Sequence, residues 1–104
     1  MPAVHFVERL NNVRPVSDSG EWDSGYWAIA EETAQRLVGG DLYLHSGPAE
    51  PSHFGGKILS YRVHRDRAAP EINGRMVFRV KPTRGHKGVP PGQDGWDDER
   101  KLVW

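Results

Sequence analysis

The histidines are the side chains whose possible chemistry can be judged first. His45 and His53 flank a polar loop that also carries Glu50, and His86 lies in a second long loop. Because imidazoles titrate near neutral pH, His45 and His53 could serve as acid and base in a small, metal-independent ribonuclease. Their spacing matches no established metal-ligand motif, and the helical histidine-glutamate pairs of zinc enzymes are missing. We therefore predict neither a metal nor a cofactor, and we rank the ribonuclease behind two binding functions.

The sequence carries no other motif of a known catalytic centre. Ser46 and Ser52 lack the glycine-flanked turn between a strand and a helix that activates a serine nucleophile. Residues 85–88 contain two glycines and a lysine but lack the lysine-serine or lysine-threonine pair of a phosphate-binding loop. The 104 residues include no cysteine, which excludes disulfides, thiol catalysis and cysteine-bound zinc. These features favour a binding module, and we predict no catalytic residue.

Aromatic side chains, several of them in or beside loops, indicate what kind of binding to expect. A ring in a wet cleft can stack on an unpaired base, which stabilises the complex by roughly 1 to 3 kcal/mol per base. Serine and histidine side chains beside the ring could then form hydrogen bonds with the edge of the base. The predicted ligand-binding residues are Trp22, Trp27, Tyr43, His45, Ser46, Ser52, His53 and Phe54.

Cationic side chains gather in the second half of the chain, where we expect them to contact phosphates. The predicted phosphate contacts are Arg62, Arg79, Lys81, Arg84 and Lys87. The whole chain has 14 basic and 14 acidic side chains, so its formal net charge is zero. Strong non-specific attraction to nucleic acid is therefore not expected.

Length and composition indicate one small globular domain over residues 1–104. Twelve glycines and eight prolines favour short elements joined by turns. The amino terminus lacks a basic region followed by a long apolar run, and no stretch of about 18 apolar residues occurs. We therefore expect a cytoplasmic protein that makes no contact with a membrane.

The first half of the chain is predicted to form a strand, a loop and a helix. Alternating apolar residues predict a strand over residues 3–8, and residues 9–21 are expected to be a loop. Apolar residues recur at helical spacing from Trp27 through Ala34 to Leu37, which predicts the main helix. Ser24 is its expected N-cap, and the two glycines at 39–40 are its expected end.

Four strands are predicted after the helix, over residues 41–45, 57–63, 75–81 and 100–104. The third is expected to pair antiparallel with the second, and the last to lie at an edge. In the first of them, Leu42 and Leu44 should face the core, so Tyr43 and His45 should point into solvent or a cleft.

The strand over residues 57–63 also alternates, with Leu59, Tyr61 and Val63 expected on its apolar side. One helix cannot cover so many strands, so these must also bury apolar faces against one another. The expected fold is therefore α+β: a small, curved, mixed or antiparallel sheet that closes towards a β-barrel, with one main α-helix.

Part of this pattern resembles the PUA-like superfamily, and within it the EVE, ASCH and YTH-type domains. The resemblance rests on Leu37, the Gly40-Asp41 pair, the apolar strand that follows, and a glycine-led strand from Gly56. It covers roughly residues 22–80, and the segment from Trp22 to Trp27 is similar to the aromatic segment that precedes the first helix in EVE-type domains. The lysine and glutamate signature of ASCH domains is absent.

The resemblance implies a PUA-like barrel that binds RNA, or DNA with a modified base, in a cleft between the helix and the barrel. A nucleic-acid-binding module is thus the preferred hypothesis, with RNA or modified DNA as the partner. The first alternative is a protein-interaction or regulatory module without enzymatic activity. The second is the ribonuclease that uses His45 and His53.

Overall fold

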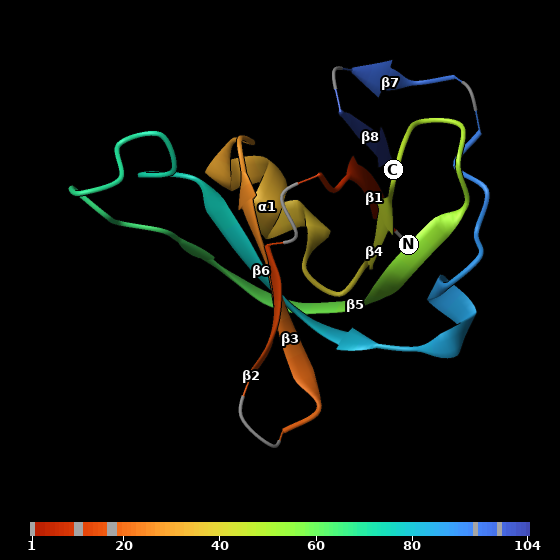
Figure 1. Cartoon of the computed structure of the whole chain (residues 1–104), viewed down its shortest axis with the longest axis horizontal. Helices are drawn as coiled ribbons and strands as arrows, with labels where there is room; N and C mark the ends of the chain where they lie inside the picture. Colours follow the sequence, from red (N-terminus) through yellow and green to blue (C-terminus); the bar gives the residue numbers. More distant parts are fainter. Residues whose placement is uncertain (1, 10–11, 17–18, 93, 98) are drawn as a thin grey trace.

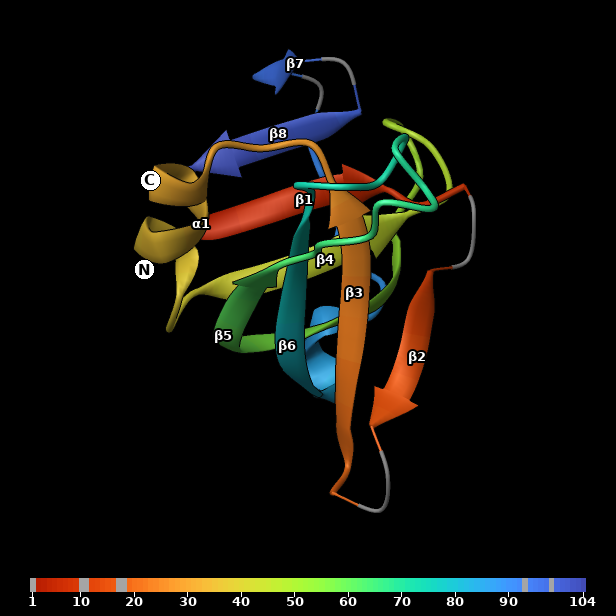
Figure 2. The same cartoon turned by 90° about the vertical axis from the view of Figure 1, so that its left-hand side faces the viewer.

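The computed structural model describes residues 2–9, 12–16, 19–92, 94–97 and 99–104. These residues form one mixed sheet of eight strands and one short α-helix (Figures 1 and 2). The strands are β1 (Ala3–Val7), β2 (Val13–Val16), β3 (Glu21–Trp27), β4 (Asp41–His45), β5 (Ser52–Val63), β6 (Met76–Pro82), β7 (Trp96–Asp97) and β8 (Arg100–Val103). The helix α1 spans Glu31–Leu37, and a 3-10 turn, η1, spans Arg84–His86. The predicted α+β class is confirmed.

The strands follow the order β2-β3-β6-β5-β4-β1-β8-β7 across the sheet. β1 and β4 run parallel, and the other neighbouring pairs are antiparallel. The sheet is strongly twisted, so that β3 and β6 run across the direction of β1 and β8 (Figure 2). Among the described residues no pairing joins β2 to β7, so the predicted closed barrel is wrong. The two outer strands are short, and Pro15 in β2 has no N–H to donate, which suits an open edge.

The main helix is shorter than predicted, because residues 21–27 form a strand. β3 pairs with β2 on one side and with β6 on the other, which satisfies its backbone groups along most of its length. Ser24 is therefore a buried strand residue and not a helix cap. α1 begins at Glu31, and Ala34 and Leu37 face the core as predicted. The helix ends before Gly39, whose φ of 88° favours glycine.

Two further elements differ from the sequence prediction. β2 lies inside the segment expected to be a loop, of which residues 10–11 and 17–18 are outside the described part. In β5 the pairing with β6 shifts between Ile58 and Ser60, so Leu59 is the extra residue of a bulge. Ile58 is consequently buried and Leu59 is 44% exposed. The predicted shared face of Leu59 with Tyr61 and Val63 is wrong.

The remaining strand predictions are confirmed with two changes. β5 begins at Ser52, five residues earlier than predicted, so His53 and Phe54 lie in a strand and not in the predicted polar loop. β1, β4 and β6 coincide closely with the predicted strands, and β5 and β6 are antiparallel as expected. β8 is present but is not an edge, because the two residues of β7 pair with its outer side.

The apolar core lies between the sheet and α1. Its buried residues are Val4, Phe6, Ala34, Leu37, Leu42, Leu44, Ile58, Met76, Phe78 and Val80. On the opposite face of β1 and β4, a second layer contains the buried His5 and His45 and the half-buried Tyr43, and Trp96 and His86 cover it. The sheet thus separates an apolar layer from a layer rich in histidine.

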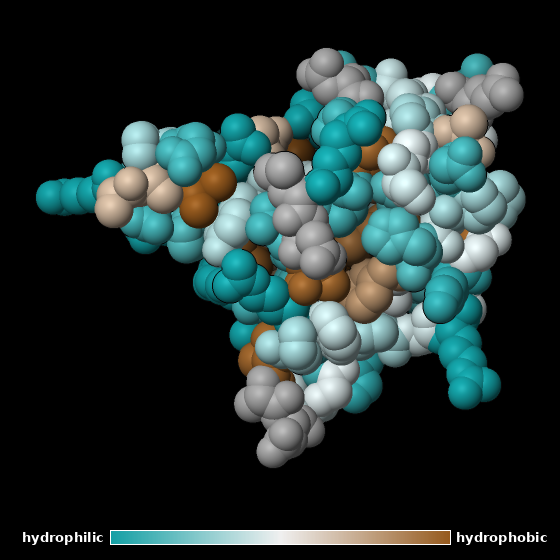
Figure 3. Space-filling view, viewed as in Figure 1, coloured by the Kyte–Doolittle hydropathy of each residue, from teal (hydrophilic) through white to brown (hydrophobic). Residues whose placement is uncertain are grey.

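The outer surface seen in Figure 3 is mostly hydrophilic, with apolar residues in small areas. The large apolar side chains that are exposed among the described residues are Val38, Leu59, Val103 and Trp104. None of the described helices has the length and apolar character needed to cross a membrane.

Candidate ligand-binding site

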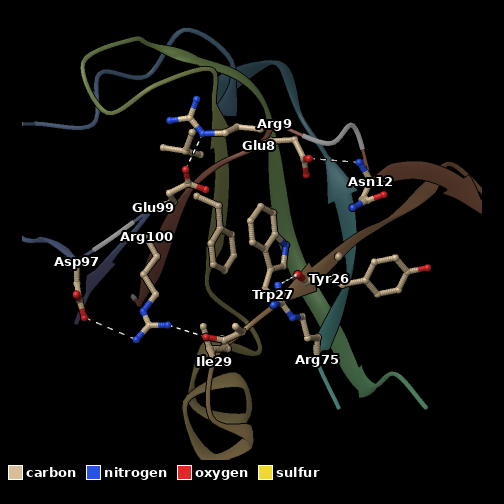
Figure 4. Close-up of a pocket in the computed structure, with 14 residues that line it drawn as sticks. Glu8, Arg9, Asn12, Tyr26, Trp27, Ile29, Arg75, Asp97, Glu99 and Arg100 are labelled. Carbon is tan, nitrogen blue, oxygen red and sulfur yellow. Dashed lines mark hydrogen bonds and ion pairs between the residues drawn. The ribbon is translucent and has the colours of Figure 1, made fainter. Parts of the chain in front are cut away.

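The main cavity opens where β1 and β3 end and the chain leaves the sheet. β1 ends at Val7 and continues with Glu8 and Arg9, whereas β3 ends at Trp27 and continues through Ile29 into α1. The diverging segments, together with the loop before β8, enclose about 570 Å³ (Figure 4). The cavity is lined by Phe6, Val7, Glu8, Arg9, Asn12, Gly25, Tyr26, Trp27, Ala28, Ile29, Arg75, Asp97, Glu99 and Arg100.

The indole of Trp27 is the most firmly held part of this cavity. One face of the ring stacks on Phe6, with centroids 3.9 Å apart and an interplanar angle of 4°. Its Nε1 donates a hydrogen bond of 3.0 Å to Ser24 Oγ, which lies in the same strand. Because Phe6 and Ser24 are both buried, the indole is fixed before any ligand arrives. Such a preorganised aromatic wall suits a flat ligand.

Charged groups surround the cavity in balanced numbers. Arg9 Nε lies 2.6 Å from Glu99 Oε1, and Arg100 donates a hydrogen bond of 2.7 Å to the carbonyl of Ala28. Arg100 also lies 3.7 Å from Asp97. With Arg75 and Glu8, the lining has three cationic and three anionic side chains. Since these charges compensate one another, the cavity suits a neutral polar group better than a phosphate.

Hydrogen-bonding groups lie opposite the charged pairs. Figure 4 shows Asn12 and Tyr26 on one side of Trp27, and Glu99, Arg100 and Asp97 on the other. The backbone N–H of Asn12 donates a hydrogen bond of 3.3 Å to Glu8 Oε1. This bond orients the carboxylate at the cavity. The amide of Asn12 can both donate and accept a hydrogen bond, so it can pair with the edge of a planar heterocycle.

The eight predicted ligand-binding residues do not meet in one place. Trp27 lines the main cavity, whereas Tyr43, His45 and Ser52 belong to the histidine layer on the other face of the sheet. Trp22 packs against Phe54, with ring centroids 5.6 Å apart, and both also contact the core. Ser46 and His53 are exposed.

His45 is fully buried, so the prediction that it points into solvent or a cleft is wrong. Its Nδ1 donates a hydrogen bond of 2.7 Å to the carbonyl of Glu50. Nε2 is therefore left to accept a hydrogen bond of 2.8 Å from His5 Nδ1. Burial lowers the pKa of His45, and burial together with His45 and Lys101 lowers the pKa of His5 to about 4. Both rings are therefore neutral at pH 7. With its nitrogens engaged inside the protein, His45 is not in a position to act on RNA.

The five predicted phosphate contacts also lie in three separate places. Arg62 and Arg79 both bind Asp23, at 3.1 Å and 2.7 Å, and Arg79 also lies 3.3 Å from Glu21. Lys81, by contrast, is exposed near Gly20.

Arg84 and Lys87 line a second, shallower depression of about 310 Å³. Its other lining residues are His53, Phe54, Gly55, Pro82 and Thr83. Two predicted phosphate contacts and two predicted ligand-binding residues thus share this depression.

Several residues of the main cavity were not predicted as site residues. Arg9 and Asn12 belong to the segment expected to be a loop, while Arg75 directly precedes β6 and Arg100 begins β8. The alternation of Trp22, Ser24 and Tyr26 is the signal that would have indicated β3. In the structure this strand brings Gly25 next to Asn12, and the N–H of Gly25 donates a hydrogen bond of 3.2 Å to the Asn12 carbonyl.

Within the described part of the chain, no group of three or more histidine, aspartate or glutamate side chains is arranged to hold a metal ion. Comparison with known proteins assigns the chain to no family. No family model matches it, and neither a curated protein nor a solved structure matches at a significant level.

Proposed function

We propose that this protein is a nucleic-acid-binding module that receives a single base, from RNA or a modified nucleic acid, in the cavity beside Trp27. The observation that carries the proposal is the combination of a 570 Å³ cavity with an indole fixed between Phe6 and Ser24. Ligand sites commonly have volumes of about 300 to 1,000 Å³, and a planar base is the natural partner of an aromatic wall. The resemblance of residues 22–80 to PUA-like domains supports the same class of ligand.

The position of the cavity agrees with this function even though the sheet is open. The cavity lies beside the segment that joins β3 to α1, although no residue of α1 lines it. Its mouth is formed by strand ends and loops, where an extruded base can enter without disturbing the core.

The balanced charges around the cavity determine how such binding should depend on salt. Arg9 and Arg100 are already paired, and Asp23 neutralises much of Arg62 and Arg79. For single strands, each phosphate contact changes the slope of log K against log salt by about −0.7. We expect a shallow slope, equivalent to about one or two phosphate contacts, because the base supplies most of the affinity.

A titration with fluorescent single-stranded RNA tests this function directly. A short RNA and its counterpart with one methylated base are titrated at low salt with the wild type and with Trp27→Phe. Loss of the indole should weaken binding about tenfold, because part of the stacking energy is lost. Trp104→Phe is the matched control, since Trp104 is 52% exposed and stacks under Arg36.

The proposal fails if no RNA binds while the wild type remains folded. It also fails if Trp27→Phe binds RNA as tightly as the Trp104→Phe control. Thermal unfolding of each variant shows whether the fold is intact.

A further inference from the structure

Asp41, His86 and Thr83 form a hydrogen-bonded chain on the face of the sheet opposite the main cavity. Asp41 is the first residue of β4. Thr83 directly precedes the turn η1 after β6, and His86 is the last residue of that turn. His86 Nε2 lies 2.8 Å from Asp41 Oδ1, and His86 Nδ1 is hydrogen-bonded to Thr83 Oγ1. The chain shares no residue with the lining of the main cavity.

The carboxylate of Asp41 determines which nitrogen of His86 carries the proton. Burial acts to raise the pKa of Asp41, but hydrogen bonds from Lys57 and His86 outweigh it and lower the pKa. Asp41 is thus ionised and favours the tautomer in which Nε2–H donates a hydrogen bond to it, and in this tautomer Nδ1 presents a lone pair. This lone pair can accept the hydroxyl proton of Thr83. An orienting carboxylate, a base and a hydroxyl are the three parts of an activated nucleophile.

The two nitrogens have exchanged the roles that they have in serine proteases, where Nε2 contacts the nucleophile and Nδ1 the carboxylate. The chemistry requires one lone pair towards the hydroxyl and one N–H towards the carboxylate, and either arrangement provides both.

The surroundings hold the imidazole of His86 in place. Its ring stacks on Tyr43, with centroids 5.0 Å apart and an interplanar angle of 29°. Lys57 Nζ lies 2.9 Å from the same oxygen of Asp41 that His86 contacts. Gly55 lets the turn approach, because a Cβ there would lie 2.7 Å from His86 Cβ and 2.5 Å from the Leu42 carbonyl. The side chains of His86 and Asp41 are only 12% and 18% exposed.

Thr83, in contrast, is exposed and lines the second depression together with Arg84, Lys87 and His53. No carboxylate belongs to this lining among the described residues. The charge beside the hydroxyl is therefore positive, and a substrate with an anionic group would be attracted to it.

We propose that Thr83, His86 and Asp41 form a hydrolytic site for esters whose acyl part carries a negative charge. Thr83 Oγ1 attacks the ester carbonyl and its proton passes to His86 Nδ1. The tetrahedral intermediate then collapses, and the leaving alcohol takes this proton. Water attacks the resulting acyl-threonine, giving one proton to His86, which returns it to the Thr83 oxygen. The net reaction converts ester and water into acid and alcohol. Asp41 is a positioning residue, and Arg84 and Lys87 bind the anionic group.

Hydrolysis of two chromogenic esters by the full chain tests the site. The probes are 4-nitrophenyl acetate and the 4-nitrophenyl monoester of succinic acid, which carries a carboxylate. The wild type should hydrolyse the anionic ester with saturation and faster than the acetate. Thr83→Ala should lower that rate at least 100-fold, as removal of a general-base-activated nucleophile does, and Thr83→Ser should restore much of it. Ser60→Ala, which removes another exposed hydroxyl, is the matched control and should leave the rate unchanged.

Mass spectrometry of the quenched reaction should find the acyl group on Thr83. Asp41→Asn should lower the rate and alter its pH profile, because the amide no longer fixes the tautomer of His86, whereas a merely structural residue would leave the profile of the remaining activity unchanged. Turnover that persists in Thr83→Ala, or a folded wild type that hydrolyses neither ester, overturns the proposal. Trp27→Phe should retain full esterase activity, so failure of this site and failure of the base-binding cavity are distinguishable.

Discussion

Replacement of His5 by asparagine should remove much of the pH dependence of stability between about pH 6.5 and pH 4. His5 is 6% exposed, and its pKa falls from 6.5 to about 4 because burial, His45 and Lys101 disfavour its charged form. Above pH 6.5 the ring is neutral in both states, and its contribution to stability is complete. As the pH falls, the unfolded chain binds a proton that the folded protein does not bind, so the free energy of unfolding decreases until the folded ring also protonates.

The size of this effect follows from the difference between the two pKa values. A difference of 2.5 units corresponds to about 3 kcal/mol in total, of which about 2 kcal/mol is lost by about pH 5. Carboxylates contribute little above that pH, so the loss between pH 6.5 and 5 comes from histidines and not from carboxylates. His45 adds a loss in the same direction, because burial lowers its pKa too.

Urea unfolding at a series of pH values measures this loss. In His5→Asn the side-chain amide can replace Nδ1–H as donor to His45 Nε2 but does not titrate, so the slope of stability against pH should flatten. The absolute stability at pH 7 should also fall, because the stacking of His5 on Tyr43 is lost. His53→Asn, which removes an exposed histidine, is the matched control. Equal pH slopes in His5→Asn and the wild type would refute the reasoning.

Further substitutions test the packing and the main cavity by the same urea titrations at pH 7. Phe78→Ala should cost about 3 to 5 kcal/mol, because Phe78 is fully buried in the core, whereas Leu59→Ala at the exposed bulge should change stability by less than about 0.5 kcal/mol. A large loss for Leu59→Ala would contradict the assigned bulge. Gly55→Ala should destabilise strongly, since a Cβ would meet the Leu42 carbonyl, and Gly39→Ala should also destabilise because of its positive φ; tolerance of Gly55→Ala would show that the chains are further apart. Ser24→Ala should cost about 1 kcal/mol, because Trp27 Nε1 loses its acceptor.

The strands with simple alternation were predictable from the sequence. In β4, Leu42 and Leu44 alternate with polar or aromatic residues, and both leucines are fully buried. The end of the helix was predictable too, because glycine at position 39 adopts the left-handed conformation. In these cases the local pattern and the tertiary structure favour the same conformation.

β3 was missed because two periods coincide in its sequence. Trp27 fits a helical pattern that continues to Ala34. The residues just before it, from Trp22 to Tyr26, alternate as in a strand. The pairing of β3 with β2 and β6 decides for the strand, and the most distant pair, Trp22 with Val80, is 58 positions apart. The bulge at Leu59 likewise depends on the register with β6.

The candidate site was predictable only in part for the same reason. Trp27 was identified by its residue type, whereas Arg75 and Arg100 reach the cavity through long-range strand pairing. The burial of His45 depends on a cover provided by Trp96, 51 residues further along the chain. Position in an alternating strand shows which face a side chain occupies but not whether another segment covers that face.

The most direct test of the base-binding cavity is an NMR titration of the protein with the single-stranded RNA that contains one methylated base. Signals from the indole N–H groups, from the asparagine side-chain amides and from the backbone amides of the whole chain are followed as RNA is added. The indole N–H of Trp27 and the amide of Asn12 should shift together and saturate with the affinity measured by fluorescence, while the indole of Trp104 should not move. Saturable shifts confined to His53, Arg84 and Lys87, with Trp27 unchanged, would contradict the account.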